Sequence, residues 1–165
     1  MRSWSTIVIV FMLLTTAAAL ARAGASGWSY FVAHDADVGR ALEKLKWDVL
    51  RKGKYYKLFP KRRPKSPHDA LIMNDTEGTH SIMDIEKVSL VETPRGRCAI
   101  MTVCPLPKAD LAAIFGTDKP TRAMVEAANE KLDAMSLQPT WSGVWIAVYD
   151  GAQPKFLYFV GHSGD

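Results

Sequence analysis

The chain has 165 residues, of which 48% are hydrophobic and 23% are charged, and its formal net charge is +4. This composition excludes an intrinsically disordered chain, and the sequence contains no internal repeat or low-complexity tract. We therefore expect a globular protein with one hydrophobic core. No motif points to a characterised family.

Residues 1–23 have the pattern of a cleaved secretory signal. Arg2 precedes an apolar run of 14 residues, and small residues around Ala21 offer a cleavage site. The run is shorter than the roughly 20 residues that a membrane-spanning helix needs. We expect a secreted or periplasmic protein whose mature domain, residues 24–165, has no transmembrane span. A membrane anchor, or a cytoplasmic protein whose start is assigned too far upstream, is the alternative.

A strand and an amphipathic helix are predicted to open the domain. Residues 28–33, W-S-Y-F-V-A, have the β-branched and aromatic content of a strand. The period then changes to that of a helix over 38–53, where Leu42 and Leu45 lie on one face. Gly53 is placed to end this helix.

A second helix is predicted to begin after Ser66, whose hydroxyl can cap it, and to end near Gly78. The chain then has the pattern of a β-hairpin, with strands at 85–92 and 97–104 joined by a turn at 93–96. Apolar residues occupy both faces of the second of these strands. We therefore expect that strand to lie inside the sheet.

Two helical segments and a second hairpin are predicted to complete the domain. The helices fall at 108–116 and 121–135, and the hairpin joins strands at 144–149 and 155–161 through a turn that starts at Asp150. The element order is β-α-α-β-β-α-α-β-β. We expect an α+β fold with a mainly antiparallel sheet of about five strands and helices packed on one face.

The two cysteines lie at opposite ends of one predicted strand. Six residues of strand would separate the Cα atoms of Cys98 and Cys104 by roughly 20 Å, whereas a disulfide requires about 4.4–6.8 Å. We therefore expect free, buried thiols and no bridge between these two residues. An intermolecular bridge, or a turn at Cys104, is the alternative.

A basic segment interleaved with aromatic residues connects the first two predicted helices. Residues 51–65, called the basic arm below, contain eight basic residues and no acidic one. Without the predicted signal, the rest of the domain has 11 basic against 17 acidic residues. Such an arm can bind anions while its rings stack or insert, and the alternative is a solvated loop. The residues that we expect to bind a partner are Lys54, Tyr55, Tyr56, Lys57, Lys61, Arg62 and Arg63.

The segment 77–86, E-G-T-H-S-I-M-D-I-E, contains a histidine, two hydroxyls and three carboxylates. His80 and Asp84 are four residues apart and would share a helical face, where they could perform acid-base chemistry or provide two metal ligands. No H-E-x-x-H or paired C-x-x-C motif accompanies them, so we expect no metal and no cofactor. A structural corner has the same composition, because Gly78 can end a helix and hydroxyls can bond loose backbone groups. We favour the corner.

Aromatic residues recur with period two in three predicted strands, so each pair shares one side of its strand. If these sides coincide, the sheet has an aromatic face, which could be packed in the core or form an open groove. The pairs are Trp28 and Tyr30, Trp145 and Tyr149, and Phe156 and Tyr158.

These patterns favour a small exported binding domain without catalysis, and an inhibitor or immunity-type protein would be one example. The partner would be a protein or an anionic surface such as a lipid or polyanion, and export would exclude nucleic acid as the natural target. The alternative is a small enzyme in which His80 and Asp84 converge with His34 or His162 in one pocket. Isolated histidines and a protruding basic arm would favour binding.

Overall fold

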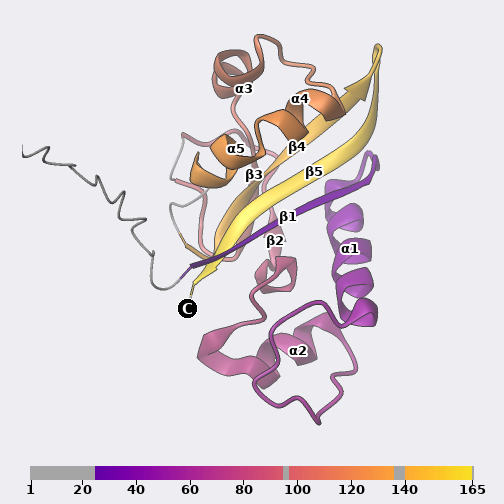
Figure 1. The fold of residues 1–165 in the computed structure, drawn as a ribbon, viewed down its shortest axis with the longest axis vertical. Coiled ribbons are helices and arrows are strands. Elements are labelled where there is room, and N and C mark those ends of the chain that lie inside the picture. Colours follow the sequence, from indigo (N-terminus) through magenta and orange to yellow (C-terminus); the bar gives the residue numbers. More distant parts are fainter. Residues whose placement is uncertain (1–24, 95–96, 136–139, 165) are drawn as a thin grey trace, which may run out of the picture.

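The computed structural model describes residues 25–94, 97–135 and 140–164. The predicted signal segment, residues 1–23, lies outside the described residues, and so does part of the predicted turn at 93–96. In chain order the described elements are β1 (Ala25–Ala33), α1 (Val38–Lys52), α2 (Pro67–Asn74), the 3-10 turns η1 (Asp75–Glu77) and η2 (Ile82–Asp84), β2 (Lys87–Val88), β3 (Thr102–Pro105), α3 (Lys108–Phe115), α4 (Arg122–Ala127), α5 (Asn129–Met135), β4 (Ser142–Asp150) and β5 (Gln153–Gly164) (Figure 1).

The five strands form one sheet in the order β1-β5-β4-β3-β2. β5 pairs antiparallel with both β1 and β4, whereas β3 pairs parallel with both β4 and β2. The predicted α+β class and the number of strands are confirmed. The expectation of a mainly antiparallel sheet is wrong, because the sheet is mixed.

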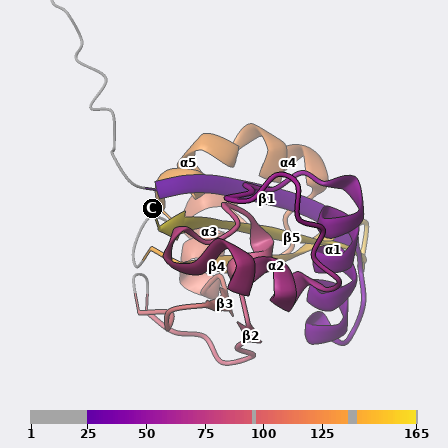
Figure 2. The same ribbon diagram turned by 90° about the horizontal axis from the view of Figure 1, so that it is seen from below.

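Helices cover both faces of this sheet, and the prediction of helices on one face is wrong. Successive residues of a strand point to opposite faces. In β5, Leu157 and Phe159 pack with the buried face of α1, while Tyr158 and Val160 pack with side chains from α3, α4 and α5. Figure 2 shows α4 and α5 on one side of the strands and α1 on the other. Each large side chain that is buried in this way stabilises the fold by about 1.5–3 kcal/mol.

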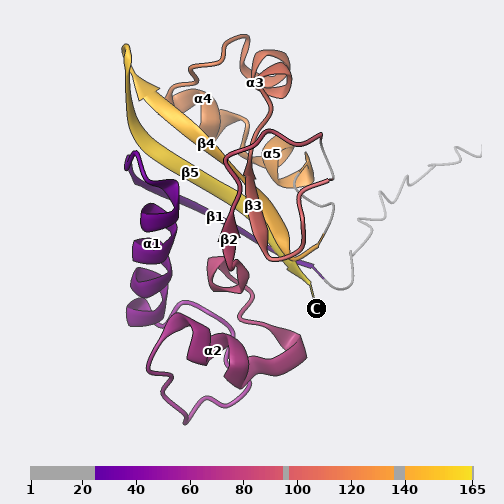
Figure 3. The same cartoon turned by 180° about the vertical axis from the view of Figure 1, so that it is seen from behind.

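The predicted hairpin over residues 85–104 is wrong. β2 has only two residues, and the 13 residues between it and β3 bring the chain back so that the two strands run in the same direction (Figure 3). Met101, with φ of 57°, ends the connection, and its carbonyl accepts hydrogen bonds from the backbone N–H groups of Glu86 and Lys87 at 2.7 and 3.0 Å. The prediction that the second strand lies inside the sheet is confirmed, because all four β3 residues are buried between β2 and β4.

A disulfide joins Cys98 to Cys104, and the prediction of free thiols is wrong. Residues 98–101 belong to the connection before β3 and are not in a strand. The chain therefore bends back between the two cysteines, and their Cα atoms are 5.9 Å apart.

Local signals placed most helix ends correctly. Gly53 adopts φ of 63° and caps α1, and the Ser66 hydroxyl accepts a hydrogen bond from the Asp69 N–H at the start of α2. α2 ends at Asn74, before the predicted Gly78, because Asp75 turns out of the helix with φ of 50°. The single helix predicted over 121–135 is divided into α4 and α5.

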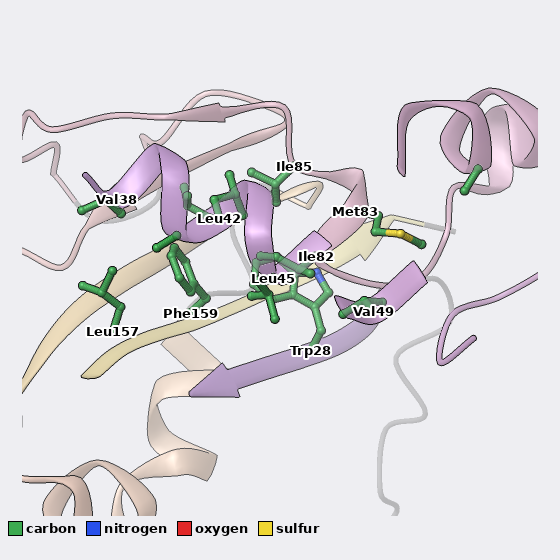
Figure 4. Close-up of a cluster of buried hydrophobic side chains, with 13 residues drawn as sticks. Trp28, Val38, Leu42, Leu45, Val49, Ile82, Met83, Ile85, Leu157 and Phe159 are labelled. Carbon is green, nitrogen blue, oxygen red and sulfur yellow. The ribbon is translucent and has the colours of Figure 1, made fainter. Parts of the chain in front are cut away.

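The apolar stripe of α1 packs against the sheet and the η2 turn. Figure 4 shows Leu42 and Leu45 facing Trp28, Ile82 and Phe159. Trp145 and Tyr30 also pack on this cluster, whereas Phe156 and Tyr158 belong to the opposite face. The aromatic pairs therefore do not combine into one aromatic face. Five of the six residues are distributed over the two hydrophobic clusters, and Tyr149, which follows an irregularity in β4, belongs to neither.

Candidate functional site

The basic arm forms the connection between α1 and α2 and lies at one end of the long axis of the molecule (Figure 1). Beyond the end of α1 it contains neither helix nor strand, and most of its residues are exposed. Such a segment keeps a defined path only where its backbone groups find partners. The partners come from α2 and from the segment that precedes η2.

A single buried amide holds the middle of the arm. The Asn74 side chain is 3% exposed. It accepts a hydrogen bond from the Leu58 N–H at 2.9 Å and donates one to the Tyr56 carbonyl at 2.8 Å. Because one planar amide binds both backbone groups, it fixes the chain direction on either side of Lys57.

The second anchor connects the arm to the segment that holds His80. The Tyr56 N–H donates to the Thr79 carbonyl at 2.8 Å. The Tyr56 ring stacks on the His80 imidazole, with 4.5 Å between ring centroids and 17° between planes. His80 Nδ1 lies 3.1 Å from the Ser26 hydroxyl of β1. The two regions that the sequence singled out separately, the basic arm and the 77–86 segment, are therefore in contact.

Asp84 organises this corner from inside the protein. Its carboxylate is fully buried. It accepts hydrogen bonds from the Thr79 N–H and hydroxyl at 2.6 and 2.7 Å, from the Ser81 N–H at 3.3 Å and from the Ser163 hydroxyl of β5 at 2.5 Å. These donors are backbone N–H groups and hydroxyls, and together they bind both carboxyl oxygens. The carboxylate fixes the loop to the sheet.

The histidines have separate surroundings. His162 is buried on β5, with its Nε2 3.3 Å from the Asp133 carboxylate of α5. His80 contacts Tyr56 and Ser26, and His34 and His68 are exposed. No hydrogen bond joins His80 to Asp84, whose oxygens are bound by Thr79, Ser81 and Ser163. Among these described contacts, His80 lies against the ring of Tyr56, and Asp84 bonds the loop to the sheet.

A hollow of about 560 Å³ opens between the C-terminal part of α1 and the basic arm. Five cations line it, and no carboxylate does: they are Arg51, Lys57, Arg62, Arg63 and Lys65. Tyr55 and Trp47 add aromatic surface to the wall. Four of the seven predicted binding residues thus line one concave site: Tyr55, Lys57, Arg62 and Arg63. Lys54 and Lys61 are exposed outside it, and Tyr56 is occupied with His80.

The charges of the arm are largely uncompensated. Arg51 pairs with Asp48, but no carboxylate of the described residues forms an ion pair with the arm cations that follow it. Lys57 lies 4.9 Å from the centroid of the Tyr55 ring, and the Arg62 guanidinium lies 4.8 Å from that of Phe59. Such cation–π contacts position a cation without neutralising it.

One part of the site was missed by sequence reasoning. Arg40, Lys44, Trp47 and Arg51 follow the spacing i, i+4, i+7, i+11 and form an exposed stripe along α1 that leads to the hollow. Asp35 binds both Arg40 and Lys44, and the hydrogen bond from Arg40 holds the pKa of that carboxyl well below its usual range. The spacing is visible in the sequence, but only the structure shows that this stripe leads to the hollow.

No protein-family model matches the chain, and no curated protein or solved structure shows significant similarity to it. Within the described parts of the chain, no helix has the length and apolar character to cross a membrane. The same residues contain no group of three or more histidine, cysteine or acidic side chains placed to hold a metal ion. The geometry and the charges of the hollow beside α1 therefore provide the basis for a proposed function.

Proposed function

We propose that this protein is a small exported binding domain without catalytic activity and that its basic arm engages an anionic partner. The observation that carries the proposal is the hollow beside α1, where five cations and no carboxylate line one concave surface. Cations held this close repel one another, and the repulsion is relieved when an anionic group enters. A polyanion or an anionic surface provides several such groups at once.

The anchoring of the arm supports the same proposal. Asn74 binds the backbone on both sides of Lys57, and Thr79 binds the Tyr56 N–H. A loop that is already ordered loses less conformational entropy when it binds. The backbone that carries Lys57 is therefore held in place before a partner binds, which a merely solvated loop would not require.

The enzymatic alternative around His80 and Asp84 has no comparable support. A general acid or base must reach the proton that it transfers. Asp84 is fully buried and holds the hydrogen bonds of its own corner, and the His80 ring stacks on Tyr56.

The proposal is tested by titrating the protein with heparin, a soluble sulfated polyanion, at several salt concentrations. The test variant is Arg62→Glu/Arg63→Glu. The matched control is Lys108→Glu/Lys131→Glu, which changes the net charge equally at exposed positions outside the arm. Each basic residue close to an anionic surface contributes on the order of 1 kcal/mol. Loss of two such contacts should weaken binding by about 30-fold or more.

We expect the control variant to bind heparin within about twofold of the wild type and the wild-type affinity to fall steeply with salt. Equal losses of heparin affinity in the two variants would mean that only the net charge of the protein matters, and this result would refute the proposal. Absence of binding by the wild type would also refute the proposal.

A further inference from the structure

We infer that the anionic partner of the basic arm is a lipid bilayer with anionic headgroups, and that Leu58 and Phe59 insert into it. This inference rests on the proposed function, because the same arm provides the cations. It goes further by naming the partner and assigning a role to apolar side chains that a soluble polyanion would not need.

The first observation is the exposure of these apolar side chains among the cations. Leu58 is 38% exposed and Phe59 is 46% exposed, and both lie between Lys57 and the basic run that starts at Lys61. Trp47, on the wall of the hollow, is 40% exposed. Lysine and arginine bind lipid phosphates, while aromatic and aliphatic side chains enter the boundary between headgroups and acyl chains.

The second observation is that the backbone beside these side chains is held in place by the fold. The Leu58 N–H is bound to Asn74, and the backbone on the other side of Lys57 is bound to Asn74 and Thr79. The exposure of Leu58 and Phe59 is therefore built into the path of the chain. The Arg62 guanidinium lies over the Phe59 ring, so a cation and an apolar group are presented together.

The third observation is the position of the arm. The loop between α1 and α2 forms one end of the long axis in opposite views of the molecule (Figures 1 and 3). No other described element extends beyond it, so the arm can approach a flat surface without obstruction. The charge distribution also favours this orientation, because the arm is entirely basic and the acidic excess lies in the rest of the mature domain.

The test is co-sedimentation of the mature protein, residues 24–165, with vesicles of phosphatidylcholine alone and of phosphatidylcholine mixed with phosphatidylglycerol. The test variant is Leu58→Ala/Phe59→Ala, which retains every cation and the backbone bonds to Asn74. The control is Ile72→Ala/Leu90→Ala, which removes two side chains that are even more exposed, at 63% and 73%, but lie outside the arm. Heparin and polyglutamate are titrated in parallel.

We expect the wild type to sediment with the anionic vesicles and not with the neutral ones. The Leu58→Ala/Phe59→Ala variant should bind the anionic vesicles about tenfold more weakly, with unchanged affinity for heparin, while the control variant behaves as wild type. Binding to heparin without binding to anionic vesicles would overturn the inference and leave the proposed function standing. Binding to polyglutamate without binding to vesicles would also overturn the inference and would point to an acidic protein as the partner. Normal binding of the Leu58→Ala/Phe59→Ala variant to anionic vesicles would overturn the inference as well. Absence of binding to every anionic probe would refute both.

Discussion

A comparison of alanine substitutions at Gly78 and Gly116 tests how the corner beneath the basic arm is packed. Both have positive φ, 67° and 70°, and both follow a helical segment. A Cβ on Gly116 would meet no atom within 4 Å. A Cβ on Gly78 would lie 2.4 Å from two ring carbons of Trp141, and that ring in turn lies against Gly164. The Trp141 ring is therefore confined on the sides that face Gly78 and Gly164.

The expected cost of each alanine follows from this geometry. At Gly116, where ψ is 9°, the left-handed conformation costs an alanine about 1–2 kcal/mol. At Gly78, where ψ is −169°, the backbone lies in a region that is essentially restricted to glycine, and an alanine costs about 1–3 kcal/mol there. At Gly78 the clash with Trp141 adds about 1–3 kcal/mol, the usual cost of overpacking. For a domain of about 140 residues, the unfolding entropy is roughly 0.3 kcal/mol per kelvin. Gly78→Ala should therefore lower Tm by about 3–10 °C more than Gly116→Ala does.

The assay is urea unfolding of both variants, with thermal melts as a second measurement. An unchanged m-value would show that the two variants unfold from native states of similar compactness. Equal loss of stability at Gly78 and Gly116 would refute the reasoning, because it would mean that Trp141 does not restrict Gly78. The arm should also become easier to cleave with trypsin in Gly78→Ala, since Thr79, which binds the arm, follows Gly78 directly.

Other expectations concern the arm, the disulfide and two tyrosines. Asn74→Ala should lower the unfolding free energy by about 1–3 kcal/mol and accelerate tryptic cleavage in the arm. Unchanged cleavage would show that the Asn74 side chain does not hold the arm in place. Cys98→Ser/Cys104→Ser opens a short loop and should cost about 2 kcal/mol in urea unfolding; stability equal to that of the oxidised wild type would contradict this. Burial raises the pKa of Tyr30 and Tyr158, so the stability due to their neutral phenols is present below about pH 10 and is lost as the pH rises through their folded pKa values. An absorbance titration in which all tyrosines ionise together near pH 10 would speak against it.

The candidate site is formed by contacts between segments that are far apart in the chain. The sequence showed a basic arm and a polar segment around His80, and it favoured a structural role for the latter. It did not indicate that Tyr56 stacks on His80 or that Asn74 binds the arm. Asn74 carried no signal of its own, because a single asparagine near a helix end usually marks a cap or a turn.

The errors about the sheet have a common physical origin. An apolar run over 97–104 predicts burial correctly, but burial does not specify whether a strand pairs parallel or antiparallel with its neighbours. The two-residue length of β2 and the turn at Met101 are set by packing against the rest of the fold. That turn also brings Cys98 to Cys104, which an extended strand would have kept apart.

The sequence by itself determined what depends on a few neighbouring residues. It specified the amphipathic face of α1, the caps at Gly53 and Ser66, the β4–β5 hairpin and the charge of the basic arm, because hydrogen bonds and side-chain periodicity act over a few positions. Only the tertiary structure decided that β3 pairs parallel with its neighbours, that Cys98 and Cys104 form a disulfide, that helices pack on both faces of the sheet and that the arm contacts His80. Each of these depends on which distant surfaces are buried together, and burial is a property of the whole fold.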